Sequence, residues 1–327
     1  MKQNILWAIA FLIIATASCQ KNAIPESPET VLDGPTGQIL LSIGQPETKV
    51  AVADMAEHRI NQVQVFIFNS AGQLETDRMA TNASPATSAT LQLSLTAKIG
   101  KKTIVALVNA PRQKPASLSQ LEAAVSDLNE NSVNNLVMIG KESVAVEEYN
   151  GTPGTCTIPV SKLASAVVLT EVTANFTGTV LEGSSFVIKE VYVKNVVGRV
   201  PYGSPSSGTD YRYNKAKLDT TPLALTYDAC NLSGTAVAKP NRAFYVYPNT
   251  KKGETCLVIH AQVGGKDTYY PFDLPVLEAN KKYSVSVNIT MLGKPDDNDD
   301  TRIAVGTLQP TITVSDWDKT ATLPYLM

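Results

Sequence analysis

The chain has 327 residues, which is long enough to bury a sizeable core and to form about two domains. Its 28 basic and 30 acidic residues give a net charge of −2, and this balance argues against nucleic acid as a partner. The 19 glycines and 19 prolines, set among many Thr, Val, Ser and Asn residues, predict short strands joined by turns.

The N-terminus has the features of an export signal. Lys2 precedes an apolar run at residues 5–14, which is too short to span a membrane. Small residues then precede Cys19, as in bacterial lipoprotein signals, although Leu would be more usual at Thr16. Cleavage would leave Cys19 as an N-terminus that carries lipid such as palmitate, and Gln20 favours passage to the outer membrane. The alternative is an ordinary secretory signal with an incidental cysteine.

The rest of the chain divides into a tether and two β-rich domains. Residues 20–35 are rich in Pro, Ser, Glu and Gly without periodicity, which is typical of a flexible linker. Residues 36–160 and 161–327 each contain about the number of short strands that a sandwich needs. We therefore predict a mainly β protein with two tandem β-sandwich domains and one short helix in the first.

The elements of the first domain follow from its apolar patterns. The run QILLSI (38–43) predicts a short strand, and QVQVFIFN (62–69) is apolar on both faces, which indicates a central strand. The run TIVALVN (103–109) predicts another buried strand. Residues 117–128 predict a helix, because Ser117 or Ser119 can cap it and its leucines fall on one stripe.

The second domain shows longer alternating strands. They include FVIKEVYVKNVV (186–197) and KYSVSVNITM (282–291). Residues 256–263 and 267–272 predict a hairpin, since Gly264 and Gly265 separate them.

The last stretch, residues 307–327, stays apolar to its end. Ile312 and Val314 alternate with polar residues, Trp317 follows, and Leu323 and Tyr325 lie in the tail. Chain ends are normally polar unless something ties them down. The stretch is therefore either a final strand with a partner in its own chain or a strand handed to a neighbouring molecule.

Residues for catalysis are missing from the sequence. No hydrolase, metalloprotease or nucleotide-binding motif occurs, so we do not predict an enzyme or a cofactor. His58 lies in a polar stretch and is expected to be solvated, whereas His260 lies in an apolar strand and is expected to be structural. The acidic loop 296–300 lacks the Gly and the distal Glu of a calcium loop, so no metal is expected. A sugar-stacking patch is a weaker hypothesis, on Tyr202, Tyr211, Arg212 and Tyr213.

Three cysteines remain after Cys19, namely Cys156, Cys230 and Cys256. In an exported protein Cys230 and Cys256 are the favoured disulfide pair because both lie in the second half. Buried thiols are the alternative.

Two basic residues between the first two predicted strands are candidates for proteolytic processing. A cut after Lys49 would make Val50 the new N-terminus, and a cut after Arg59 would expose Ile60. Taken alone, both residues are better explained as ordinary surface charges.

These features together resemble the Bacteroidales fimbrillins, the FimA-like major subunits of type V pili. The resemblance covers nearly the whole chain and rests on the order and spacing of segments that begin at Cys19. They are QILLSI, QVQVFIFNSAG, TIVALVNAP followed by SLSQLEAAV, SKLASAVVLTEV, RAFYVYPN, KKYSVSVNITMLG and LQPTITVSDWD.

The resemblance implies two transthyretin-like β-sandwich domains and maturation by strand exchange. A protease specific for Arg or Lys would remove the lipidated N-terminus with the first strand, and a strand of another subunit would fill the groove. The leaving strand would contribute Ile39, Leu41 and Ile43, and the cut would fall after Lys49, or alternatively after Arg59. The donor would contribute Ile312, Val314, Trp317, Leu323 and Tyr325.

The resemblance also implies partners and a location. The partners would be other copies of the chain, related pilus subunits and, before maturation, outer-membrane lipid through Cys19. Host or bacterial surface ligands would follow from a role in adhesion at the cell surface. Alternatives are an uncleaved anchor or tip subunit and a surface glycan-binding lipoprotein.

Overall fold

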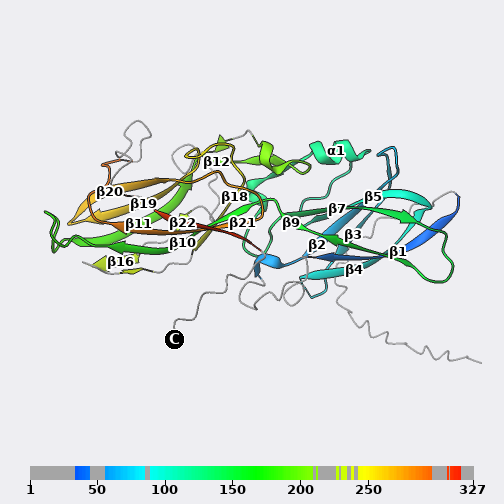
Figure 1. Cartoon of the computed structure of the whole chain (residues 1–327), viewed down its shortest axis with the longest axis horizontal. Helices are drawn as coiled ribbons and strands as arrows, with labels where there is room; N and C mark the ends of the chain where they lie inside the picture. The colour runs from blue at the N-terminus through cyan, green and yellow to red at the C-terminus, as the bar shows by residue number, and fades with distance from the viewer. Residues whose placement is uncertain are drawn as a thin grey trace, which may run out of the picture.

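A computed structural model describes residues 34–44, 56–84, 89–208, 211–212, 226–227, 230–233, 237–238, 242–296, 308 and 310–317. The described chain is mainly β, as predicted, and its strands gather in two halves of an elongated molecule (Figure 1). Within these residues no helix is long and apolar enough to cross a bilayer.

The first half is built from two sheets packed face to face. The larger has the strand order β3-β2-β5-β7-β9, and the smaller has the order β4-β1-β8. Residues of both sheets share one buried apolar cluster. The strands are β1 (Thr36–Gly44), β2 (Gln62–Phe68), β3 (Leu74–Thr81), β4 (Thr90–Lys98), β5 (Gly100–Val108), β7 (Met138–Val146), β8 (Gly154–Pro159) and β9 (Ser161–Lys162).

The second half also contains two larger sheets. In one, β10 (Ser165–Ala174) and β21 (Lys281–Ile289) pair in parallel, and β17 (Val237–Ala238), β18 (Arg242–Val246) and β22 (Thr311–Asp316) join them. In the other, β11 (Ser185–Lys194) pairs with β19 (Cys256–Val263). Its remaining strands are β15 (Thr226–Tyr227), β16 (Cys230–Ser233) and β20 (Lys266–Asp273).

A small sheet crosses between the halves. β6 (Val125–Asp127) pairs with β13 (Arg199–Pro201), and one buried cluster extends from Phe66 in β2 to Trp317 beyond β22. The other short elements are β12 (Val196–Val197), β14 (Tyr211–Arg212), η2 (Leu128–Glu130) and η3 (Pro205–Ser207). β9 pairs with β7 of the first half, so strand pairing continues two residues past the predicted boundary at 160. The division into two domains stays a prediction.

Several predicted elements are present. β2 is buried on both faces, and the hairpin of β19 and β20 turns at Gly264 and Gly265, whose φ angles are +55° and +84°. The helix is shorter than predicted, because α1 spans Leu118–Ala123 and is capped by Ser117. The chain becomes extended at Ala124, since the next residues pair with β13 in place of continuing the helix.

Candidate functional site

β1 is the central strand of its sheet. It pairs antiparallel with β4 along its whole length and parallel with β8 from Ile39 to Gly44. Leu41, for example, lies opposite Leu93 on one side and Cys156 on the other. Both edges of β1 are therefore occupied by strands of its own chain.

The inward face of β1 fills the core of the first half. Ile39, Leu41 and Ile43 are 2%, 0% and 0% exposed and belong to the cluster that β2 and β5 also line. Burying such a side chain contributes about 1.5–3 kcal/mol relative to leaving it in water. The predicted leaving strand thus covers apolar side chains of β2 and β5 that would otherwise be exposed to water.

Two glycines set the register of β1. A Cβ at Gly37 would lie 1.9 Å from the carbonyl oxygen of Glu147, and one at Gly44 would lie 2.8 Å from that of Ala89. Backbone approaches this close leave no room for a side chain. A strand in this place must carry three large inward side chains and almost nothing at the Gly37 position.

Of the two peptide bonds predicted as processing sites, the structure describes the one after Arg59. Lys49 and Val50 lie outside the described residues. The bond after Arg59 is held in the fold, because its carbonyl oxygen accepts a 2.7 Å hydrogen bond from Asn109 Nδ2, and Ile60 is fully buried. The next amide, of Asn61, donates to Asn109 Oδ1 at 2.8 Å. Proteases cut exposed, poorly bonded backbone, so this bond is shielded.

Just ahead of Arg59, Glu57 gathers donors from the second half. Its carboxylate accepts hydrogen bonds from Trp317 Nε1 at 2.7 Å and from the Tyr245 hydroxyl at 2.9 Å. Lys282 Nζ lies 3.5 Å from the same carboxylate. Burial and the neighbouring Glu57 raise the pKa of Tyr245, so its hydroxyl stays a donor. We call these four residues the Glu57 clasp.

The rings around the clasp are packed closely. Tyr245 stacks on Trp317 with ring centroids 5.8 Å apart and planes 6° from parallel. Lys162 Nζ lies 5.0 Å from the centroid of the indole ring, a cation–π distance, and 3.4 Å from His58 Nδ1. His58 is 2% exposed, so the expectation that it is solvated was wrong. It lies beside Glu57, and its polar sequence neighbours gave no sign of this burial.

The predicted donor residues are divided. Ile312 and Val314 lie in β22, which is an edge strand paired antiparallel with β21 of its own chain. Ile312 packs on the core, Val314 is 51% exposed, and Trp317 is buried in the clasp. Leu323 and Tyr325 lie outside the described residues.

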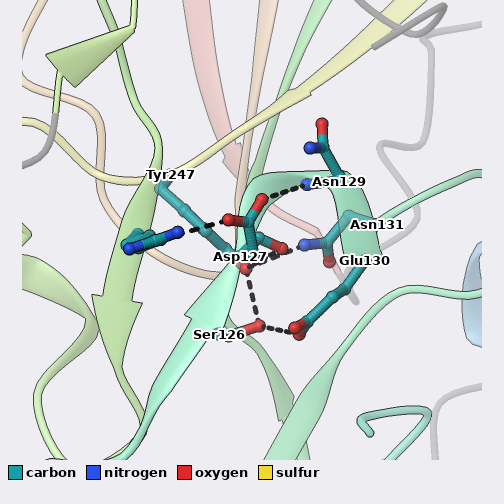
Figure 2. A network of polar contacts seen from close by, with 7 residues as sticks. Ser126, Asp127, Asn129, Glu130, Asn131 and Tyr247 are labelled. Carbon is teal, nitrogen blue, oxygen red and sulfur yellow. Dashed lines mark hydrogen bonds and ion pairs between the residues drawn. The ribbon is translucent and has the colours of Figure 1, made fainter. Parts of the chain in front are cut away.

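A second polar cluster also joins the halves (Figure 2). The Tyr247 hydroxyl accepts from Asn131 Nδ2 at 2.9 Å and donates to Ser126 Oγ, 2.7 Å away. The Ser126 hydroxyl in turn donates to Glu130 Oε2 at 2.7 Å. Burial raises the pKa of Glu130, and the hydrogen bond from Ser126 opposes that shift. Arg199 Nε donates to the Asp127 carboxylate at 3.2 Å.

Three weaker predictions meet the structure in different ways. Tyr202 is 1% exposed, so it does not belong to a surface sugar-stacking patch. Tyr213 and residues 297–300 of the acidic loop lie outside the described part, and Tyr211 and Arg212 are described by their backbone. Across the described ranges, no group of three or more His, Cys, Asp or Glu side chains is placed to hold a metal ion.

The strand register contradicts the predicted disulfide. Cys230 pairs with Ile188 on one edge of β11, and Cys256 pairs with Lys194 on the other edge. At about 3.3 Å per residue, the two cysteines are separated by roughly 20 Å along the sheet. The Cα atoms of a disulfide lie within about 7 Å of each other.

Comparisons with known proteins agree with this architecture. A model of the major fimbrial subunit protein family (FimA) matches residues 44–180. A fimbrilin (FimA) structure from Porphyromonas gingivalis W83 has a TM-score of 0.65 at 15% identity, covering 87% of this chain and 98% of that one. No curated protein matches the sequence.

Two further structures are similar over most of both chains. A candidate cell adhesion protein from Bacteroides eggerthii DSM 20697 has a TM-score of 0.64 at 19% identity, covering 88% of this chain and 97% of that one. Another, from Parabacteroides distasonis ATCC 8503, has a TM-score of 0.62 at 16% identity, with 86% and 97% covered. At these sequence identities the structural similarity establishes the fold alone. The family model adds a sequence match to fimbrial subunits over residues 44–180. The chain therefore has the fold of the fimbrilin structures, and its residues 44–180 match the model of the FimA major fimbrial subunit family.

Proposed function

We propose that the protein is a structural subunit of a cell-surface fimbria that matures by losing β1 and polymerises by accepting a strand in its place. It is exported as a lipoprotein through Cys19, and a cut after Lys49 releases the lipid together with β1. The central position of β1 carries this proposal, because both of its edges are paired and its inward side chains are buried.

Removal of β1 leaves a place that only another strand can fill. The facing edges of β4 and β8 lose their ladder partners, and the cluster around Val65 and Ile104 loses its cover. Unpaired edges and an apolar groove are unstable in water. Strand addition satisfies both, because main-chain bonds pair the edges and alternate side chains fill the groove.

The C-terminal tail has a matching pattern. Ala321, Leu323, Tyr325 and Met327 alternate, with the smallest residue first. If the tail runs in the direction of β1, Ala321 takes the place of Gly37 and the three large side chains take those of Ile39, Leu41 and Ile43.

The opposite direction is disfavoured. It would put Met327 at the Gly37 position, where even a Cβ would lie 1.9 Å from the Glu147 carbonyl oxygen. Ala321 would bring its Cβ to the same oxygen, so the groove must widen at this point to admit it, but by less than a methionine side chain would require. We therefore propose that the donor runs parallel to the strand it replaces.

The first test is the N-terminal residue of the protein at the cell surface. We expect Val50, because the bond after Arg59 is shielded by Asn109 and by the burial of Ile60. Protein that still begins at Cys19 would contradict the polymerising version and support an uncleaved anchor or tip subunit.

The second test separates donor from acceptor. Deletion of residues 319–327 should abolish polymers while the monomer still folds and still accepts a tail from an intact chain. A matched control replaces Leu326 by Ser, which should leave polymers intact because Leu326 alternates with the proposed groove residues and would face outward in the proposed donor strand. Polymers of unchanged length from the deletion variant would rule out the donor role.

A further inference from the structure

We propose that Glu57 is a positioning residue that locks the end of β22, so that the C-terminal tail leaves the subunit at Trp317. The lock itself is a property of the single chain. Only its consequence for assembly rests on the proposed function.

Trp317 is held from several directions. Its indole N–H donates to Glu57, its ring stacks on Tyr245, and its backbone N–H donates to the Asn280 carbonyl oxygen at 3.2 Å. Lys281 forms an ion pair with Asp316, one residue earlier. A hydrogen bond from a buried indole N–H to a carboxylate is stronger than a hydrogen bond between neutral groups. This end of β22 is therefore firmly fixed.

The rest of β22 has little to hold it. Among the described strands it has one neighbour, β21, and its Val314 side chain is 51% exposed. Ile312 packs against the core, but none of the six residues Thr311–Asp316 is fully buried. Strands with few buried contacts open locally at low free energy. The clasp, together with the Asn280 and Lys281 contacts at the same end, is therefore the main restraint that the described residues place on the C-terminal end of β22.

The origin of the lock lies far away in sequence. Glu57 precedes β2 and is separated from Trp317 by 260 residues. Glu57 also follows Lys49 and precedes Arg59, the two candidate processing residues. A cut after Lys49 leaves Glu57 in the chain, whereas a cut after Arg59 would separate it and leave the indole N–H without its acceptor. The position of the cut thus decides whether the lock survives.

The lock also sets the length of the tail. With Trp317 held, residues 318–327 are available as a donor, and an extended chain spans about 3.3–3.6 Å per residue. Seven of them, 321–327, match the groove, so three residues connect the donor to its own subunit, or roughly 10 Å. Under the proposed function, neighbouring subunits must then be in direct contact.

Amide hydrogen exchange of the full-length precursor, whose own β1 fills the groove, tests the lock without any polymer. Trp317→Phe removes the indole donor and keeps an aromatic ring, and Glu57→Leu removes the acceptor at similar volume. Each should speed exchange in Thr311–Asp316 at least tenfold, while β11 and β19 stay protected. Tyr270→Phe is the matched control, because it removes the hydrogen bond from a buried tyrosine to the Met291 carbonyl oxygen in the same half.

Two results would overturn the proposal. One is an unchanged rate of amide exchange in β22 of the Trp317→Phe variant. This variant alone is a sufficient test of the lock if Glu57→Leu does not fold. The other is an equal acceleration of all strands, since this would make the clasp a contributor to global stability and not a local lock. Neither result depends on whether the tail is a donor, so failure of the lock is distinguishable from failure of the proposed assembly.

Discussion

Among single residues, Glu130 in the Tyr247 cluster should respond to pH in an unusual direction. Burial raises its pKa in the folded chain above the ordinary glutamate value. The folded state therefore binds this proton more readily than the unfolded state, and protonation of Glu130 favours folding as the pH falls through the raised pKa. The gain is complete below the ordinary value and is lost again as the pH rises.

Glu130→Gln tests this sign. The amide keeps an acceptor for the Ser126 hydroxyl but carries no charge, so we expect the variant to be more stable than the parent at pH 7. The difference should shrink as the pH approaches 4, which urea denaturation at several pH values will measure. A variant that is less stable at pH 7 would show that the carboxylate charge is favourable there, which contradicts the raised pKa. Glu148→Gln is the matched control, because Glu148 is exposed and lies outside the Tyr247 cluster. Asp127→Asn is unsuitable as a control, because Asp127 pairs with Arg199.

At the scale of elements, the register of β1 should depend on Gly37. Gly37→Ala places a methyl group against the Glu147 carbonyl oxygen, and overpacking of this kind costs about 1–3 kcal/mol. The precursor should lose this stability in denaturant unfolding, while a chain that begins at Val50 lacks the residue and is unaffected. Gln38→Ala is the matched control, since Gln38 is the exposed neighbour on the outward face. A precursor that tolerates Gly37→Ala without loss would mean that β1 can shift its register.

Strand patterns were predictable where each strand meets the core by simple alternation. QVQVFIFN reads as a strand covered on both sides, and β2 is such a strand. The helix prediction failed at its C-terminal end, because Val125 pairs with Pro201. Pro201 lies 76 residues further along the chain (201 minus 125), so the local sequence pattern carries no sign of this pairing. His58 and Tyr202 were misplaced for the same reason, since distant residues cover both. The Glu57 clasp could not be predicted at all, because a lone Glu in a polar stretch does not specify a partner such as Trp317.

Across the whole molecule, the fold should direct proteases away from Arg59. We expect brief trypsin treatment of the folded precursor to cut before residue 56 and to spare the Arg59–Ile60 bond. Asn109→Gly should make that bond cleavable, because glycine keeps the positive φ of 58° at this position while removing the three side-chain hydrogen bonds to the backbone of residues 59–62. Mass spectrometry of the first fragments distinguishes the sites. Cutting after Arg59 in the folded parent would show that hydrogen bonding and burial do not protect it.

The central place of β1 also has a consequence for the timing of assembly. Each precursor carries the occupant of its own groove, and β4 and β8 hold it from both sides. Under the proposed maturation, raising the precursor concentration would not start a fibre, since no molecule has a vacancy to offer. The supply of competent subunits would follow the number of cuts made per second. Fibre growth is then expected to be paced by the protease at the surface, and a cell could store subunits at high density without premature polymers.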